Sequence, residues 1–156
     1  MGAVVFAVCA EAHARGAKVV LLPAIPYGTE TNMRELPLAM NLQPSTVTLI
    51  IRDLVQSLVN SGIRKIVLLN SHGGNEMKPL LRELYGKTPA QLFLCSWYNC
   101  LNACYSEIFD KPEDHGGELE TSFLLSTHPH LVAKNPDGTL AADAGAVAKS
   151  RFEAIN

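Results

Sequence analysis

Two short segments contain most of the residues that could do chemistry. His72 lies in the segment N-S-H-G-G-N (residues 70–75), directly after the apolar run of residues 66–69, and His115 opens the segment H-G-G-E-L-E (residues 115–120). An imidazole and a carboxylate that converge on one cleft suit a divalent zinc, iron or manganese ion. Such an ion activates water and polarises a carbonyl, as amide hydrolysis requires. The two segments therefore predict metal-assisted hydrolysis, with the second histidine donating a proton to the leaving nitrogen.

Each of these side chains also has a simpler interpretation. A lone His72 could cap the following helix or hold a loop, but its place after a buried strand and beside two glycines favours a site. His115 could cap the helix that follows it. Glu118 and Glu120 could be first-turn acids that complement the helix dipole. They project about 200° apart on a helix, so only one of them can face a site.

The segments around these residues alternate between strand and helix. We predict strands over residues 18–22, 65–69 and 91–97, and helices over residues 3–15, 45–61, 76–85, 98–109 and 117–127. A turn is expected at residues 135–138, with an alanine-rich helix after it. This order predicts an α/β protein with right-handed crossovers and a mostly parallel sheet between helices.

The loops that follow the predicted strands are unusual. Residues 23–44 form a long excursion with four prolines and little periodicity, and residues 96–99 are polar and aromatic. Loops of such length tend to be functional. Because they follow parallel strands, they should emerge with residues 70–75 at one edge of the sheet. Glu30 in the long loop is a conceivable further ligand, although nothing in its spacing requires it.

Length and composition limit the class of protein. A chain of 156 residues with 47% hydrophobic and 18% charged residues describes a globular domain. A net charge of −2 without a basic run argues against nucleic acid or an anionic membrane as a partner, and no apolar stretch is long enough to cross a bilayer. Four cysteines are too few for a disulfide scaffold, which favours the cytoplasm. A small molecule is the expected partner.

At these residues the chain resembles the creatininase (creatinine amidohydrolase) family. Residues 70–75 are similar to the family motif N-G-H-G-G-N, and residues 115–122 to its motif H-A-G-x-x-E-T-S. The loop at residues 23–29 stands where the family has a substrate loop rich in proline and glycine. The resemblance covers roughly residues 5–150.

The resemblance implies a three-layer α/β/α sandwich with a two-metal site and a homo-oligomeric assembly, often a hexamer. The implied reaction is hydrolysis of a non-peptide C–N bond in a cyclic amide or formamide. Carried onto this chain, His72 binds one metal ion and Glu120 the other, with Glu118 as the alternative ligand. His115 acts as the proton donor. We expect substrate contacts from three further residues: Gly73, Asn75 and Trp97.

The chain departs from the family pattern at its beginning. Family members start with a segment of the type E-x-H-G-x-H-L-P-x-x-T-D, which supplies three metal ligands. Here Glu11 and His13 mimic part of that spacing but lie in a predicted helix. We therefore expect residues 1–156 to be one creatininase-like domain truncated at its N-terminus, and conceivably at its C-terminus. We expect it to bind metal weakly and to turn over little substrate alone.

Two hypotheses follow from this departure. The chain is either part of a metal-dependent amidohydrolase or a non-catalytic subunit that keeps the fold without the metal ions. The named family member carries an acid two residues after the motif histidine, where this chain has Gly74. Amides other than creatinine are therefore at least equally good candidates for the substrate.

Overall fold

A computed structural model of the chain describes residues 2–110 and 116–141. The chain forms two compact units. The first consists of Val19–Cys100, and the second contains Gly2–Lys18 together with residues that follow Cys100. In the described part of the chain, both strands of the sheet belong to the first unit. The expectation of a single domain over residues 1–156 stays a prediction.

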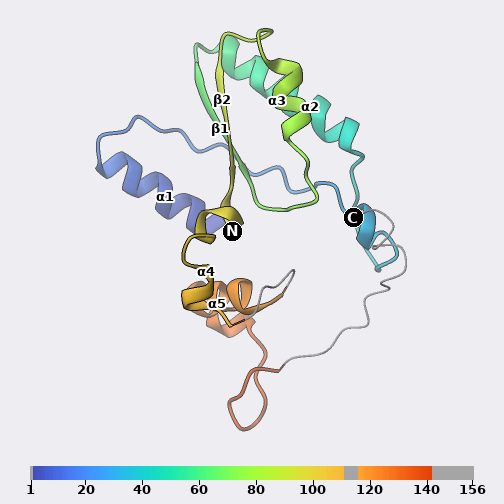
Figure 1. Cartoon of the computed structure of the whole chain (residues 1–156), viewed down its shortest axis with the longest axis vertical. Helices are drawn as coiled ribbons and strands as arrows, with labels where there is room; N and C mark the ends of the chain where they lie inside the picture. Colours follow the sequence, from blue (N-terminus) through green and yellow to red (C-terminus); the bar gives the residue numbers. More distant parts are fainter. Residues whose placement is uncertain (1, 111–115, 142–156) are drawn as a thin grey trace. The chain divides into compact units, whose positions relative to one another are not determined.

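Two neighbouring strands run parallel in the first unit (Figure 1). Strand β1 is Lys65–Asn70 and strand β2 is Gln91–Ser96. Their register pairs Asn70 with Ser96. Because the strands are parallel, their carboxyl ends lie at the same edge of the sheet. The predicted α/β class and both of these strands are confirmed.

Two helices lie on one side of this strand pair (Figure 1). Helix α2 is Pro44–Asn60 and helix α3 is Lys78–Leu84. Pro44 is placed in the first turn of α2, where its missing N–H is not needed. Apolar residues recur along α2 at helical spacing and meet Ile66 of β1. The buried core of the unit consists of Val47, Ile51, Val55, Val59, Ile66, Leu80 and Leu84.

The opposite side of the strand pair has a different character. Val67 of β1 is 63% exposed and Phe93 of β2 is 51% exposed within the described part of the chain. Side chains alternate between the two faces of a strand, so these residues point away from the core that holds Ile66. The core of the first unit is therefore built on one face of its sheet.

The predicted strand over residues 18–22 is wrong. Residues 17–27 are irregular, and Val20 is 79% exposed. Aliphatic and β-branched residues suit a strand, but a strand also needs a neighbouring backbone to pair with. The described sheet contains only β1 and β2. The following long loop is irregular, as predicted, except for the 3₁₀ turn η1 (Thr31–Met33).

The second unit is helical. Helix α1 is Gly2–Ala14 and helix α5 is Glu118–Thr127, close to their predicted bounds. Gly16, with φ of +89°, follows α1 and donates its N–H to the carbonyl of His13, as expected for a helix C-cap. The short 3₁₀ helix η3 (Pro129–Leu131) follows α5.

The single helix predicted over residues 98–109 is wrong. The 3₁₀ helix η2 (Trp97–Leu101) and the short helix α4 (Tyr105–Ile108) take its place, with a turn at residues 102–104. This stretch contains Asn99 and Asn102, and asparagine is a weak helix former because its side chain can compete for backbone hydrogen bonds.

The turn predicted at residues 135–138 is confirmed. Gly138 donates its N–H to the carbonyl of Asn135 over 2.9 Å. The alanine-rich helix predicted after this turn falls outside the described residues. Within the described residues, no helix combines the length and apolar character needed to span a bilayer.

Candidate metal centre

The turn after β1 is closed by the side chains of two asparagines. Asn70, which is only 5% exposed, donates its amide N–H to the carbonyl of Asn75 over 3.2 Å. The Oδ1 of Asn70 accepts the backbone N–H of His72 at 3.3 Å and the amide of Asn75 at 3.4 Å. The backbone N–H of Asn75 also donates to the carbonyl of His72 over 3.1 Å. This asparagine clasp holds His72 just beyond the end of the strand.

The same clasp fastens the long loop to this turn. The backbone N–H of Thr29, a buried residue, donates to Oδ1 of Asn75 over 2.9 Å. The next N–H, that of Glu30, donates to Oδ1 of Asn41 over 2.7 Å. Gly28 accepts the N–H of Leu42 at 2.8 Å, so the two arms of the loop are joined. The loop backbone beside His72 is therefore held by side chains from two directions.

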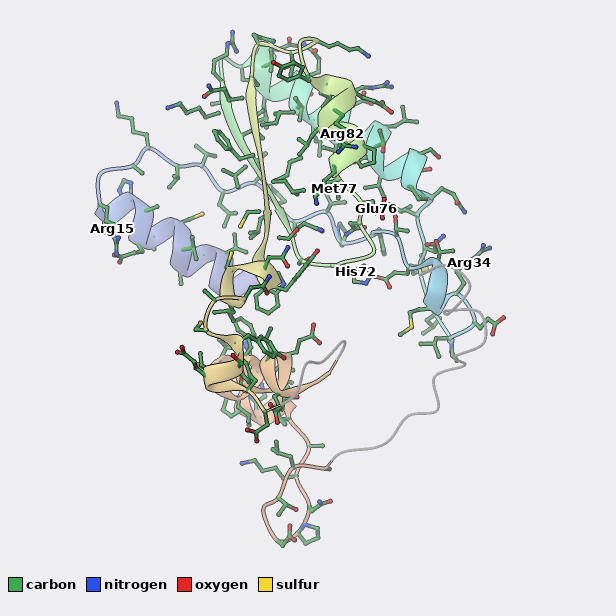
Figure 2. The ribbon with its side chains drawn as sticks, in the orientation of Figure 1. Arg15, Arg34, His72, Glu76, Met77 and Arg82 are labelled. Carbon is green, nitrogen blue, oxygen red and sulfur yellow. The ribbon has the colours of Figure 1, made fainter. Side chains whose placement is uncertain are left out.

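The result is a contact between an imidazole and a carboxylate. Nδ1 of His72 lies 3.2 Å from Oε1 of Glu30, and their side chains are 17% and 35% exposed. Figure 2 shows His72 on the turn that follows β1, toward the segment that carries Arg34. The prediction from sequence placed His72 at the strand end but found no spacing that required Glu30. The structure brings the two residues together within the first unit.

Two glycines permit this close approach. A Cβ at Gly74 would lie 2.7 Å from Cε1 of His72 and 2.9 Å from the carbonyl oxygen of Thr29. A Cβ at Gly28 would lie 2.7 Å from Oδ1 of Asn75. All three distances are shorter than van der Waals contact allows, so the loop and the turn can meet in this way only where residues 28 and 74 lack a side chain.

Three residues were expected to contact substrate. Asn75 forms part of the clasp, with both ends of its amide hydrogen-bonded to protein. The indole N–H of Trp97 donates to the carbonyl of Ser71 over 3.3 Å, which places the ring beside the turn. Gly73 has room around it: the nearest atom to an added Cβ is the hydroxyl oxygen of Tyr98 at 3.9 Å. Their contacts with substrate stay predictions.

The second motif lies in the second unit. Oε2 of Glu120 accepts the backbone N–H of Gly116 at 2.8 Å, and Oε2 of Glu118 accepts that of Asp110 at 2.9 Å. The Glu120 contact satisfies a backbone N–H just before α5, whereas the Glu118 contact ties the start of the helix to Asp110, eight residues earlier. His115 lies outside the described residues. The assignments of Glu120 as metal ligand and His115 as proton donor stay predictions.

The donor set near His72 can be compared with what a metal ion needs. An imidazole nitrogen and a carboxylate oxygen are suitable donors for manganese, iron or zinc. A catalytic zinc site takes three protein ligands and keeps one open position. Among residues 2–110 and 116–141, no group of three His, Cys, Asp or Glu side chains gathers as such a set would. The donor atoms of His72 and Glu30 are thus of the types that such a metal ion binds, and they supply two of the ligands it needs.

A pair of thiols lies near the end of β2. The Sγ atoms of Cys95 and Cys100 are 3.9 Å apart. Burial raises the pKa of the Cys95 thiol, and the neighbouring Cys100 raises that pKa further through its hydrogen bond and charge. Less thiolate is present at a given pH when the pKa is raised, so Cys95 should react slowly with alkylating agents.

We expect the alkylation rate of Cys95 by iodoacetamide to reach half its maximum at a higher pH than for an ordinary exposed cysteine. Replacement Cys100→Ser should lower this midpoint only partly, because burial, the largest cause, remains. Site-resolved mass spectrometry across a pH series measures the rates. A Cys95 midpoint below the ordinary cysteine pKa would contradict the expectation.

The fold and the polar turn together define a class. An α/β protein that gathers an imidazole and a carboxylate at the carboxyl end of a parallel strand has its candidate site where such folds bind ligands. The chain belongs to the creatininase family: its sequence matches the family model, described as creatinine amidohydrolase, over residues 3–154. This is a family of hydrolases, and the family resemblance drawn from the two motifs is confirmed.

Individual relatives agree with this assignment. Creatinine amidohydrolase of Pseudomonas putida is 28% identical in a match that covers 81% of this chain and 56% of that protein. The chain thus spans about half the length of this relative. A Bacteroides fragilis protein proposed to be a creatinine amidohydrolase is 28% identical, with a TM-score of 0.72 over 91% of this chain and 56% of that one.

Two further structures are described with a metal or a ligand. A structure named creatininase Mn is 25% identical, with a TM-score of 0.67 over 94% of this chain and 66% of that one. A creatininase variant complexed with creatine is 25% identical, with a TM-score of 0.65 over 90% and 65% of the two chains. These likenesses confirm the creatininase-like fold.

Proposed function

We propose that this chain carries the His72 part of the active site of a metal-dependent hydrolase that cleaves the C–N bond of a cyclic amide or formamide. The observation that carries the proposal is the imidazole of His72, held by the clasp of Asn70 and Asn75 within 3.2 Å of the Glu30 carboxylate. Family membership supports the hydrolase class. The relative that is named creatininase Mn supports the need for a metal ion.

Each candidate site residue has a defined role in this proposal. His72 holds one divalent ion, while Asn70 fixes the backbone of the turn that carries it. When bound, the metal centre supplies an activated water and polarises the carbonyl of the substrate. His115 donates a proton to the leaving nitrogen, and Glu120 is a ligand of the second metal ion. Trp97, beside the turn, forms a wall against the substrate ring.

The surroundings of position 74 bear on which substrates should be assayed. A relative of this chain is named creatinine amidohydrolase, and another structure holds creatine. Here Gly74 packs against His72 and the carbonyl of Thr29 and leaves no room for an acidic side chain. A substrate bound beside Gly74 would therefore meet no carboxylate from position 74, unlike a substrate of a family member that has an acid there. We propose small cyclic amides and formamides as the class to assay, with creatinine among them.

Metal binding by His72 is the first test. We expect the chain to bind Mn²⁺ weakly, because a closed site needs more donors than His72 and Glu30 supply. Replacement His72→Ala should lower the affinity at least about tenfold, since loss of even an outer partner of a ligand costs 10–100-fold. Free Mn²⁺ is counted by electron paramagnetic resonance. Manganese is chosen over zinc because thiols bind zinc strongly.

The matched control is His13→Ala, which removes an exposed histidine of α1. It should leave Mn²⁺ affinity within about twofold, a change small beside the 10–100-fold effect of altering a metal site. If His72→Ala and His13→Ala bind Mn²⁺ equally well, His72 is not a ligand and the proposal fails. That outcome favours the second hypothesis, a subunit of the family that keeps the fold without metal.

A further inference from the structure

We infer that Glu30 is a ligand of the same divalent cation as His72, through its Oε1 atom and the Nδ1 atom of the imidazole. This inference rests on the proposed function, because it takes His72 as a metal ligand. It adds a carboxylate from the long loop, a segment in which the sequence showed no metal-binding motif. The three observations that carry it are the distance between the two donor atoms, the support of the loop backbone, and the partial burial of the pair beside Gly74.

The distance between the two donor atoms matches that of two ligands on one ion. Metal–nitrogen and metal–oxygen distances are each about 2.1 Å in such sites. Two donors at that distance are about 3.0 Å apart at an angle of 90° and about 3.4 Å apart at a tetrahedral angle. Nδ1 of His72 and Oε1 of Glu30 are 3.2 Å apart, between these values. The separation of the two atoms therefore matches that of two donors on one cation.

Hydrogen bonds hold the backbone of Glu30 in place without a bound metal ion. Its own N–H is bound to Oδ1 of Asn41 at 2.7 Å, and the preceding N–H, that of Thr29, is bound to Oδ1 of Asn75 at 2.9 Å. Asn75 belongs to the same turn as His72, so one side chain sets the spacing between the two donors. A site held in this way loses little conformational freedom when a ligand binds.

The partial burial of the pair strengthens its attraction for a cation. His72 and Glu30 are 17% and 35% exposed, so water screens the carboxylate less than at an open surface. Gly74 contributes because a Cβ there would lie 3.2 Å from Nδ1 of His72, within the space beside the donor atom. The glycine thus leaves no Cβ of residue 74 beside Nδ1, and the Glu30 carboxylate lies next to that atom.

The test uses the full chain, Mn²⁺ as the probe, and Glu30→Gln. Glutamine keeps the size of the side chain and a hydrogen-bond acceptor but removes the charge that a divalent ion binds. We expect Glu30→Gln to weaken Mn²⁺ binding about tenfold or more, in the 10–100-fold range for residues that support a metal site. The matched control is Glu35→Gln, which removes an exposed carboxylate from the same loop. It should leave the affinity within about twofold, well short of that range.

A double variant separates a shared ion from two independent effects. If Glu30 and His72 bind one ion, adding Glu30→Gln to His72→Ala should weaken Mn²⁺ binding by less than Glu30→Gln weakens it alone, and losses that simply multiply would contradict a shared ion. Equal affinities of Glu30→Gln and the unchanged chain, with His72→Ala still impaired, would overturn this inference and leave the proposed function standing. Unimpaired binding by His72→Ala would overturn the proposed function itself. Thermal unfolding without metal checks that each variant is folded.

Discussion

Replacement Asn70→Leu should lower the free energy of unfolding by about 2–4 kcal/mol, because it leaves two backbone groups of the turn without partners. Asn70 is 5% exposed, donates to the carbonyl of Asn75, and accepts the N–H of His72. Leucine branches at Cγ as asparagine does and is larger, so the substitution removes the hydrogen bonds without leaving a cavity. Each buried polar group left unsatisfied costs about 1–3 kcal/mol.

Urea unfolding followed by circular dichroism measures this difference. The matched control is Asn60→Leu at the exposed end of α2, where the amide of Asn60 accepts a single surface hydrogen bond from Gln56. Surface substitutions of this kind change the free energy of unfolding by about 0.5 kcal/mol or less. If Asn70→Leu were no more destabilising than Asn60→Leu, the clasp would have no part in holding the turn.

The second large effect is expected from Gly74→Ala. The added Cβ would lie 2.7 Å from Cε1 of His72 and 2.9 Å from the carbonyl oxygen of Thr29, so either the ring or the loop must move. Overpacking of this kind costs about 1–3 kcal/mol. Because the movement separates His72 from Glu30, Mn²⁺ affinity should also fall by about tenfold. Thermal unfolding and Mn²⁺ titration measure the two effects.

The neighbouring glycine supplies the matched control for this prediction. A Cβ at Gly73 meets only the hydroxyl oxygen of Tyr98, at 3.9 Å. Replacement Gly73→Ala should therefore be neutral, or stabilising by about 0.4–1 kcal/mol through the reduced freedom of the unfolded chain. Equal losses of stability and Mn²⁺ affinity for both variants would show that the turn is merely sensitive to substitution. The explanation by contact with His72 would then be wrong.

The parts of the fold that the sequence predicted well have strong local patterns. Helix α2 carries apolar residues at regular helical spacing, and β1 is a short apolar run bounded by polar residues. The failures lie where local pattern does not decide. Residues 18–22 have the composition of a strand but no partner strand in the described sheet. Residues 98–109 contain weak helix formers such as asparagine and form two short segments, η2 and α4, in place of one helix.

Of the two donor residues at the candidate site, only His72 could be predicted from the sequence. His72 could be placed because an apolar strand, a histidine and two glycines follow one another directly. Glu30 could not, because the contact joins residues 42 positions apart across a loop without periodicity. The asparagines that fasten this loop, Asn41 and Asn75, are a weak signal, since asparagine is common in loops. Hydrogen bonds between side chains and residues far apart in the chain produce no regular spacing that could be recognised in the sequence.

Two asparagines and two glycines together position His72 and Glu30. Asn70 and Asn75 close the turn after β1, and Asn75 reaches across to hold the loop that carries Glu30. Gly74 and Gly28 allow the two backbones to approach. Together they keep an imidazole and a carboxylate at the spacing of two ligands on one ion. In a creatininase family member, this is where a metal ion should bind if the chain contributes to hydrolysis.

The measurement that tests this claim most directly is nuclear magnetic resonance of the ¹⁵N-labelled chain with substoichiometric Mn²⁺, which broadens signals near the bound ion. We expect the imidazole signals of His72 and the backbone amides of Glu30 and Gly74 to broaden first. Broadening that begins at the exposed pair His128 and His130, whose rings lie 6.0 Å apart, with His72 unaffected, would contradict it.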